Sequence, residues 1–280
     1  MYRFCLIIIV FIAPACNKYE FKDLSTTYIN TERIELISSN GQNLSHNITD
    51  LWLFIEDGYA GTFSLPAHIP VLESGKHRVS IYPGIRNYGI RSKPEIYTLL
   101  NEYKTELDLQ SKNEITVIPK YTYKSTAISY MQENFESSSI FIYDLDSFRS
   151  STIIRSNLNA RDGKYAGYGL LNSANRTIES STNKIEISTS SKKSAYLEID
   201  FISDTEMQIG LISIQGNTSI KSYFLTLNAT PDWKKIYIPL YEIIPTQDGD
   251  TFQLAIKSEL KSPASTAYFF IDNLKLICLP

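Results

Sequence analysis

The sequence predicts an all-β protein made of two sandwich domains, and three observations support this class. Apolar and polar residues alternate with a period of two over many short runs, as they do in strands with one buried face. Turn signals such as Asp57-Gly58 separate these runs. The 19 Tyr and 13 Phe are residue types that favour strands, so the composition agrees with the pattern.

The charge balance argues against nucleic acid as a partner. The chain has 27 basic and 30 acidic residues, for a formal net charge of −3. Proteins that bind nucleic acid need an excess of basic groups to neutralise phosphates. At 280 residues the chain can hold two domains that each bury a core, so we expect a globular protein without a nucleic-acid partner.

The N-terminal stretch MYRFCLIIIVFIAPAC has the pattern of an export signal. Arg3 supplies the positive start, and the apolar run that follows is too short to span a bilayer as a mature helix. Small residues precede Cys16, and this arrangement resembles a bacterial lipoprotein signal, in which the cysteine becomes the acylated first residue. Ala13 stands where such signals usually carry Leu or another aliphatic residue, so an ordinary signal peptide with an incidental cysteine is the alternative.

The lipoprotein resemblance implies a membrane partner and a location. Several acyl chains on Cys16 would hold the protein firmly, since a single chain binds a membrane only marginally. We therefore expect an outer-membrane-anchored lipoprotein of the cell envelope, on its periplasmic or its surface face, with a signal peptide over 1–15 and a tether over 16–24. Cys5 leaves with the signal, so we expect Cys278 to be an unpaired, buried and inert thiol.

The segment 25–122 predicts an immunoglobulin-like β-sandwich. Strand-like runs such as TERIELISS, DLWLFIE, HRVSIYP and EITVIP are separated by turns, at a spacing typical of such sandwiches. One part, 94–104, has apolar residues at helical spacing and is either a helix or an irregular crossing between strands. We expect the crossing.

Within this segment, the run from Ile48 to Ile90 resembles the N-terminal part of lipoproteins of Bacteroidetes-type bacteria. The resemblance is carried by a strand with Trp, an Asp-Gly turn, the letters LPA and then VLESG. It implies a surface or envelope lipoprotein and carries no activity with it.

The segment 126–280 contains a long series of strand-like runs and no helical stretch, which fits two antiparallel sheets in a jelly-roll sandwich. Its clearest feature is 195–214, where two alternating runs flank a polar break. We expect these runs to form an antiparallel hairpin whose apolar face is scaffold. A ligand would be met by loops or by the outward face of the first run, formed by Tyr196, Glu198 and Asp200.

Four motifs of this segment resemble the galactose-binding-like jelly rolls, which include many carbohydrate-binding modules. They are Asn134-Phe135-Glu136, Asp162 to Gly167, Trp233 to Tyr237, and Phe270 to Leu274. In that fold a structural Ca²⁺ often ties the first and last strands. The resemblance puts Glu136 and Asp272 at the carboxylate positions, and oxygen ligands suit Ca²⁺. The alternative is that both carboxylates cap strand ends in solvent.

Aromatic side chains are the candidates for ligand contact. Trp52 and Trp233 could stack on a sugar ring, and core packing is the alternative for both. Tyrosines near glycine-rich loops are further candidates, and the sequence does not choose among them. They are Tyr82, Tyr88, Tyr165 and Tyr168.

We expect no enzyme. The three histidines, His46, His68 and His77, are not spaced as a zinc pair, and no hydrolase or phosphate-binding motif occurs. Asp144 and Asp146 share one face if they lie in a strand, so they could hold a cation or act as acid and base. The alternative for this pair is a solvated turn.

The leading hypothesis is a non-catalytic binding module anchored to the cell envelope. The first domain would be a spacer, and the C-terminal jelly roll would bind glycan or another envelope component. The alternative is a structural or assembly subunit of an envelope protein complex. A lesser alternative is a glycan-active hydrolase that uses the Asp144 and Asp146 region.

Overall fold

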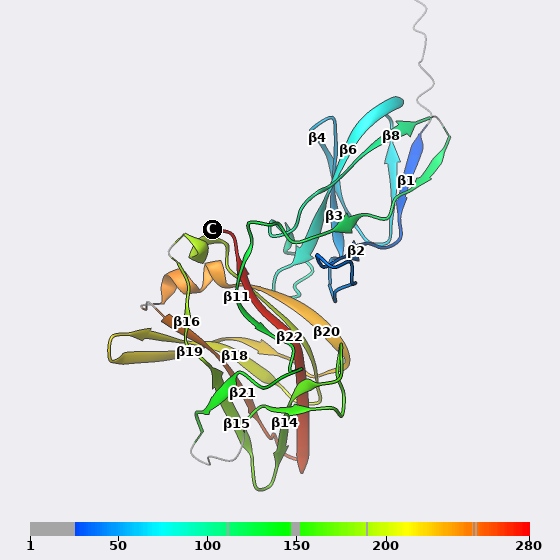
Figure 1. Ribbon diagram of the computed structural model, residues 1–280. Coiled ribbons are helices and arrows are strands. Elements are labelled where there is room, and N and C mark those ends of the chain that lie inside the picture. The colour runs from blue at the N-terminus through cyan, green and yellow to red at the C-terminus, as the bar shows by residue number, and fades with distance from the viewer. Residues whose placement is uncertain (1–25, 111, 147–151, 189, 248, 250) are drawn as a thin grey trace, which may run out of the picture.

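The computed structural model describes residues 26–280 apart from 111, 147–151, 189, 248 and 250. Figure 1 shows two β-domains in chain order, with the C-terminus at the junction between them. The signal peptide over 1–15, Cys16 and the tether over 16–24 lie outside the described residues. Within the described part, no helix is long and apolar enough to cross a membrane.

The first domain has ten strands among the described residues, arranged in two layers. One layer is a five-stranded sheet in the order β4-β3-β6-β7, with β8 also paired to β6. The other layer holds the sheets β5-β1-β9 and β10-β2, in which β1–β9 and β2–β10 are parallel. The strands are β1 (Thr27–Thr31), β2 (Glu35–Leu36), β3 (Asp50–Ile55), β4 (Gly58–Ser64), β5 (Ala67–Val71), β6 (Gly75–Arg86), β7 (Pro94–Ile96), β8 (Tyr103–Leu109), β9 (Glu114–Thr116) and β10 (Lys120–Tyr121).

Period-two alternation builds the core of this sandwich. Leu51 and Leu53 on β3 and Ile81 on β6 are fully buried, and they belong to the same cluster as Ile29 and Ile69 of the opposite layer. The segment 94–104 is the expected irregular crossing. It contains β7 and then a turn in which the Leu100 N–H donates to the Tyr97 carbonyl at 3.1 Å, so the apolar side chains enter the core without a helix.

The second domain is a jelly roll of two antiparallel sheets. The sheet β13-β14-β22-β17-β20, with β11 paired to β22, is called the front sheet here, and β12-β15-β21-β18-β19, with β16 paired to β21, is the back sheet. The strands are β11 (Ile128–Glu133), β12 (Phe141–Asp144), β13 (Ile154–Ser156), β14 (Ala166–Asn172), β15 (Thr177–Thr182), β16 (Ile185–Glu186), β17 (Tyr196–Ser203), β18 (Met207–Gln215), β19 (Thr218–Leu227), β20 (Thr230–Pro239), β21 (Thr251–Glu259) and β22 (Thr266–Cys278). Three short 3₁₀ helices occur in the described part of this domain, η1 (Ser191–Ser194), η2 (Leu240–Glu242) and η3 (Ile244–Thr246).

Together these domains confirm the all-β class, with a first sandwich followed by a jelly roll. The expected hairpin over 195–214 is wrong, however. β17 pairs with β20 and β22 in the front sheet, whereas β18 pairs with β19 and β21 in the back sheet. Alternation predicts which face of a strand is buried, and it does not specify the neighbouring strand. The two apolar faces therefore meet across the core, where Ile199 and Ile209 are both fully buried.

The end of β22 lies at the junction of the domains. Tyr196, Tyr237 and Ile277 of the second domain belong to the apolar cluster of the first. Residue Asn87 forms a parallel bridge with Tyr237, and the Tyr88 N–H donates to the Tyr237 carbonyl at 2.9 Å. Both apolar and hydrogen-bonded contacts thus join the domains.

Candidate functional site

The outward face of β17 lies beneath the first domain. Tyr196, Glu198 and Asp200 point away from the jelly-roll core, as the alternation predicts, yet they are only 3%, 1% and 1% exposed. The expectation that this face meets a ligand is therefore wrong. Outward residues of a strand are solvated only if no other domain packs on the sheet, and period-two alternation does not report such packing.

Buried carboxylates of this face accept hydrogen bonds from the first domain. The Tyr97 and Tyr123 hydroxyls donate to Glu198 Oε1 at 2.6 and 2.7 Å. The Ser45 hydroxyl donates to Asp200 Oδ2 at 2.6 Å. These three bonds tie loops of the first domain to the centre of the front sheet.

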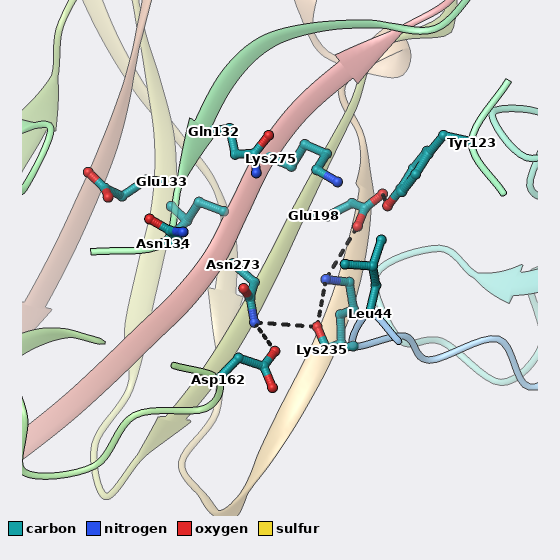
Figure 2. Close-up of a pocket in the computed structure, with 12 residues that line it drawn as sticks. Leu44, Tyr123, Gln132, Glu133, Asn134, Asp162, Glu198, Lys235, Asn273 and Lys275 are labelled. Carbon is teal, nitrogen blue, oxygen red and sulfur yellow. Dashed lines mark hydrogen bonds and ion pairs between the residues drawn. The ribbon is translucent and has the colours of Figure 1, made fainter. Parts of the chain in front are cut away.

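Lys235 supplies the positive charge of this junction (Figure 2). Its Nζ lies 3.3 Å from Glu198 Oε2 and 3.4 Å from Asp200 Oδ2. Burial would raise the pKa of Glu198, but the attraction of Lys235 and Lys275 and the two tyrosine hydrogen bonds outweigh it, so the net shift is downward. Glu198 is therefore an ionised carboxylate with its charge matched inside the protein.

Asn273 connects this ionic cluster to the loop before β14. Its Nδ2 donates to Asp162 Oδ2 at 2.7 Å (Figure 2). It also donates to Asp200 Oδ2 at 3.0 Å. Asn273 has φ +49 and sits at a register shift, where Glu198 faces Lys275 but Asp200 faces Asp272. This β-bulge turns the Asn273 amide out of the alternation and toward the two carboxylates.

A cavity of about 70 Å³ lies among these residues, bordered also by Leu44, Gln132 and Asn134. It has room for a few waters. Lys235 pairs with Glu198 and Asp200 across the junction of the domains, so the cavity is best described as the interior of a structural joint. We assign no ligand to it.

Glu136 and Asp272, the predicted metal ligands, both hold the loop 161–165. Glu136 Oε1 accepts the N–H groups of Lys164 at 2.8 Å and Tyr165 at 3.0 Å. Asp272 Oδ2 accepts the N–H groups of Arg161 at 3.1 Å and Asp162 at 3.3 Å. The two carboxylates thus bind opposite ends of one loop through its main chain.

These residues do not fit a calcium ion. Ca²⁺ needs six to eight oxygen ligands. The carbonyls of Phe135 and Glu136 instead accept Arg155 Nε at 2.6 Å and Nη2 at 2.8 Å, so a guanidinium occupies the place beside them. Among the residues that the structure describes, no group of three His, Cys, Asp or Glu side chains is placed to hold a metal.

Asp272 nevertheless has an unusual environment, because it is fully buried. Burial raises its pKa to about 6, with repulsion from Asp162 adding to the rise and the main-chain hydrogen bonds opposing it. Near neutral pH, the ionisation of Asp272 therefore lowers the stability of the folded state.

Four of the six aromatic candidates, Trp52, Trp233, Tyr165 and Tyr168, do not converge on one site. The Trp233 indole N–H donates to Asn159 Oδ1 at 3.3 Å, the Tyr165 ring lies 3.2 Å from the Arg155 guanidinium carbon, and the Tyr168 ring stacks on Phe270 at 4.8 Å. Trp52 belongs to the other domain, on the outer face of its five-stranded sheet.

The Asp144 and Asp146 pair forms a turn at the end of β12. The Asp146 N–H donates to Asp144 Oδ1 at 3.2 Å. The register places Tyr143 opposite Ser181 and Asp144 opposite Ser180, so Asp144 faces the inner side of the back sheet. The pair thus forms a turn, but Asp144 is not solvated as that alternative expected, because its Oδ2 is buried.

The outer face of the back sheet has a row of small residues between two polar rows. Ser181, Ala255 and Gly210 are partners across β15, β21 and β18. The flanking rows hold Glu179, Lys257 and Gln208 on one side, and Gln253, Ile212 and Lys221 on the other. We call this surface the polar face.

Glu179 lies in one flanking row of the polar face and is only 9% exposed. It accepts the Tyr223 hydroxyl at 2.6 Å and forms an ion pair with Lys221. Burial and the hydrogen bond to Glu179 raise the pKa of Tyr223, so its hydroxyl stays a donor. The Ser181 hydroxyl is buried and has no hydrogen-bond partner among the described residues, and such an atom calls for a ligand or a water.

Gly210 allows the Tyr223 ring to lie across the polar face. A Cβ at this position would come within 2.7 Å of Tyr223 Cδ1 and within 2.6 Å of the Ser222 carbonyl oxygen. Sequence reasoning missed Glu179 and Tyr223. Gly210 was the available signal, because a single glycine inside a strand marks a close approach.

Comparison with known proteins gives likenesses of fold only. No protein-family model and no curated sequence matches the chain. The solved structures it is similar to include a family 61 carbohydrate-binding module, TmCBM61, in complex with β-1,4-galactotriose, at 15% identity and TM-score 0.37 over 53% of this chain and 97% of that one. A family 11 carbohydrate-binding module from Clostridium thermocellum, in complex with a β-1,3-1,4-mixed-linked tetrasaccharide, is 14% identical with a TM-score of 0.40. The match covers 55% of this chain and 96% of that one. The CBM22-1 xylan-binding domain of Paenibacillus barcinonensis Xyn10C is 11% identical with a TM-score of 0.38. The match covers 56% of this chain and 97% of that one.

Such TM-scores reflect partial agreement between backbones. The strand pairing of this chain, and not these likenesses, defines its fold and its candidate site.

Proposed function

We propose that the protein is a cell-envelope lipoprotein, anchored through Cys16, that binds glycan without catalysis on the polar face of its back sheet. The observation that carries the proposal is the cluster of Glu179, Lys221 and Tyr223 beside the unpartnered Ser181 hydroxyl. Sugar hydroxyls both donate and accept hydrogen bonds, and this cluster offers a carboxylate, an ammonium group and two hydroxyls.

The sheet makes this surface suitable for binding. Strands β18 and β21 each have a hydrogen-bonded neighbour on both sides. The polar groups are therefore held in place before a ligand arrives. A rigid surface loses little conformational entropy on binding. The tyrosine ring adds an apolar surface to the hydrogen-bonding groups.

The test is binding of neutral gluco-, xylo-, galacto- and manno-configured tetrasaccharides to the chain from residue 17 onward, measured by array and calorimetry. Tyr223→Ala should weaken binding about tenfold, which is 1.4 kcal/mol. Ile220→Ala, an exposed change on the same strand, is the matched control and should leave binding unchanged. Equal binding by Tyr223→Ala and the parent would refute the placement on the polar face.

The anchor has its own test. Labelling with a lipid precursor in cells should mark the parent and not Cys16→Ala, which should leave the membrane fraction. Equal membrane association of the two would sink the lipoprotein proposal.

A protein partner is the second candidate, and an exposed apolar patch on the front sheet favours it. Ile154, Leu170 and Tyr268 are 54%, 41% and 41% exposed. Leu170 faces Tyr268, and Ile154 faces Tyr168, two residues before Leu170 on the same side of β14. Exposed apolar patches often mark protein interfaces. Failure to bind any glycan, together with a crosslinked envelope protein that is lost on Tyr268→Ser, would favour an assembly subunit.

A further inference from the structure

The outer face of the five-stranded sheet in the first domain carries a strip of aromatic rings. Trp52 and Phe54 alternate with buried Leu53 on β3, so they point away from the core. Trp52 pairs with Tyr82 on β6, and Phe54 pairs with Tyr59 on β4. All four rings are at least partly exposed, and Tyr59 is 60% exposed. We call these four residues the aromatic strip.

Gly84 sets the orientation of Trp52. A Cβ at residue 84 would collide with Trp52 Cζ3, and it would also come within 2.7 Å of the Asp50 carbonyl oxygen. The six-membered ring of the indole therefore lies directly over the main chain at Gly84. The sheet supports this edge of the indole, and the side chain as a whole is partly exposed.

Edge contacts fix the remaining rings. Phe54 meets Tyr82 at 5.2 Å and 72°, and Tyr59 at 5.5 Å and 55°. The Tyr59 hydroxyl and Thr62 Oγ1 lie in hydrogen-bond contact at 2.7 Å. Tilted and edge-on pairs of this kind are the favoured aromatic geometry, so the strip is ordered without a ligand.

A hollow with polar walls begins where the strip ends. It has a volume of about 320 Å³ and lies between β6 and β8, with Ser80, Arg78, Asp57, Lys104 and Glu106 in its wall. Ser80 pairs with Phe54, so the hollow adjoins the strip directly. Its charged groups are of both signs.

We propose that the aromatic strip and this hollow form a glycan-binding site in the first domain, separate from the polar face. Pyranose rings present C–H groups that pack on the outer side of Trp52 and on its neighbours, and the next sugar places its hydroxyls against Ser80, Arg78 and Lys104. The strip offers rings for stacking, and the adjoining hollow offers a hydroxyl and charged groups for hydrogen bonds, which together match the apolar faces and hydroxyls of a sugar chain. The first domain is then a binding domain as well as a spacer.

The two tryptophans of the chain allow a direct test. In Trp233→Phe, Trp52 is the sole indole, and titration with the tetrasaccharide panel should change its emission. Trp52→Phe keeps Trp233 as the only indole and should show no such change. Calorimetry should give about tenfold weaker binding for Trp52→Ala and Tyr82→Ala. Leu72→Ala is the control for loss of an exposed apolar side chain elsewhere in the first domain.

Failure of this proposal is distinguishable from failure of the polar-face proposal. Binding weakened by Trp52→Ala but not by Tyr223→Ala supports the strip alone. Binding weakened by Tyr223→Ala, with Trp52→Phe and Trp52→Ala folded and equal to the parent, overturns the strip. Absence of any emission change in Trp233→Phe across the panel also overturns it.

Discussion

The Tyr97 hydroxyl of the first domain donates a 2.6 Å hydrogen bond to Glu198 of the second, across 101 positions of sequence. Both residues are buried, at 1% exposure each. The Glu198 carboxylate is stable in this buried position because Lys235 forms an ion pair with it and Tyr123 donates a second hydrogen bond.

Lys235→Met should destabilise the protein strongly. The change leaves Glu198 and Asp200 buried without their shared cation, and removal of one partner from a buried ion pair costs about 3–5 kcal/mol. Urea denaturation measures the loss. Lys234→Met, one residue earlier and exposed, is the control. Equal free energies of unfolding for the two variants would contradict the role of Lys235.

Asp272 should make stability fall as pH rises. Its folded pKa of about 6 lies above the ordinary value of 3.8, so its stabilising contribution is complete below about pH 4 and is lost as pH rises through 6. The difference of about two units corresponds to at most about 3 kcal/mol. Denaturation between pH 4 and pH 7 should show this slope in the parent and not in Asp272→Asn. A slope of the same size in the variant would assign it to another group.

Calcium should not stabilise the protein, because Glu136 Oε1 and Asp272 Oδ2 already accept main-chain N–H groups. The melting temperature should be the same in calcium and in a chelator. Arg155→Met should lower it, since hydrogen bonds from a charged donor contribute about 1.5–3 kcal/mol. Arg161→Met, whose side chain is exposed, is the control. A rise of several degrees with calcium would restore the metal site that the resemblance implied.

Gly84→Ala should displace Trp52. The added methyl meets the indole and the main chain, and overpacking of this kind costs about 1–3 kcal/mol. In the Trp233→Phe background the emission of Trp52 should move to longer wavelength as the ring leaves the sheet. Gly58→Ala in the same sheet, with its nearest atom at 3.2 Å, should leave the emission in place.

The local sequence pattern predicts which face of a strand is buried, but it does not predict which strands pair with one another. Alternation correctly put Leu197 and Met207 in the core, and it assigned their strands to one hairpin although they belong to opposite sheets. The outward direction of Glu198 was also correct. Its burial depends on Tyr97 and Tyr123, whose distance in sequence makes the contact invisible to any local pattern.

The candidate sites show the same division. Residue type alone points to Trp52, whereas its close contact with Gly84 depends on the β3–β6 register. Glu179 has no distinctive local context, and its pairing with Lys221 and Tyr223 requires the sheet order β15-β21-β18-β19. Sites assembled across several strands need the tertiary register before their chemistry can be recognised.

Tyr196, Tyr237 and Ile277 of the second domain complete the apolar core of the first. If the jelly roll unfolds, the first domain loses these three side chains and exposes the surface they covered. The two domains should therefore melt in one cooperative transition, with a calorimetric enthalpy that matches the van't Hoff value for the whole chain. An isolated first domain would expose the part of its core that these three side chains cover. We therefore expect the two domains together to be the smallest stable unit of this protein.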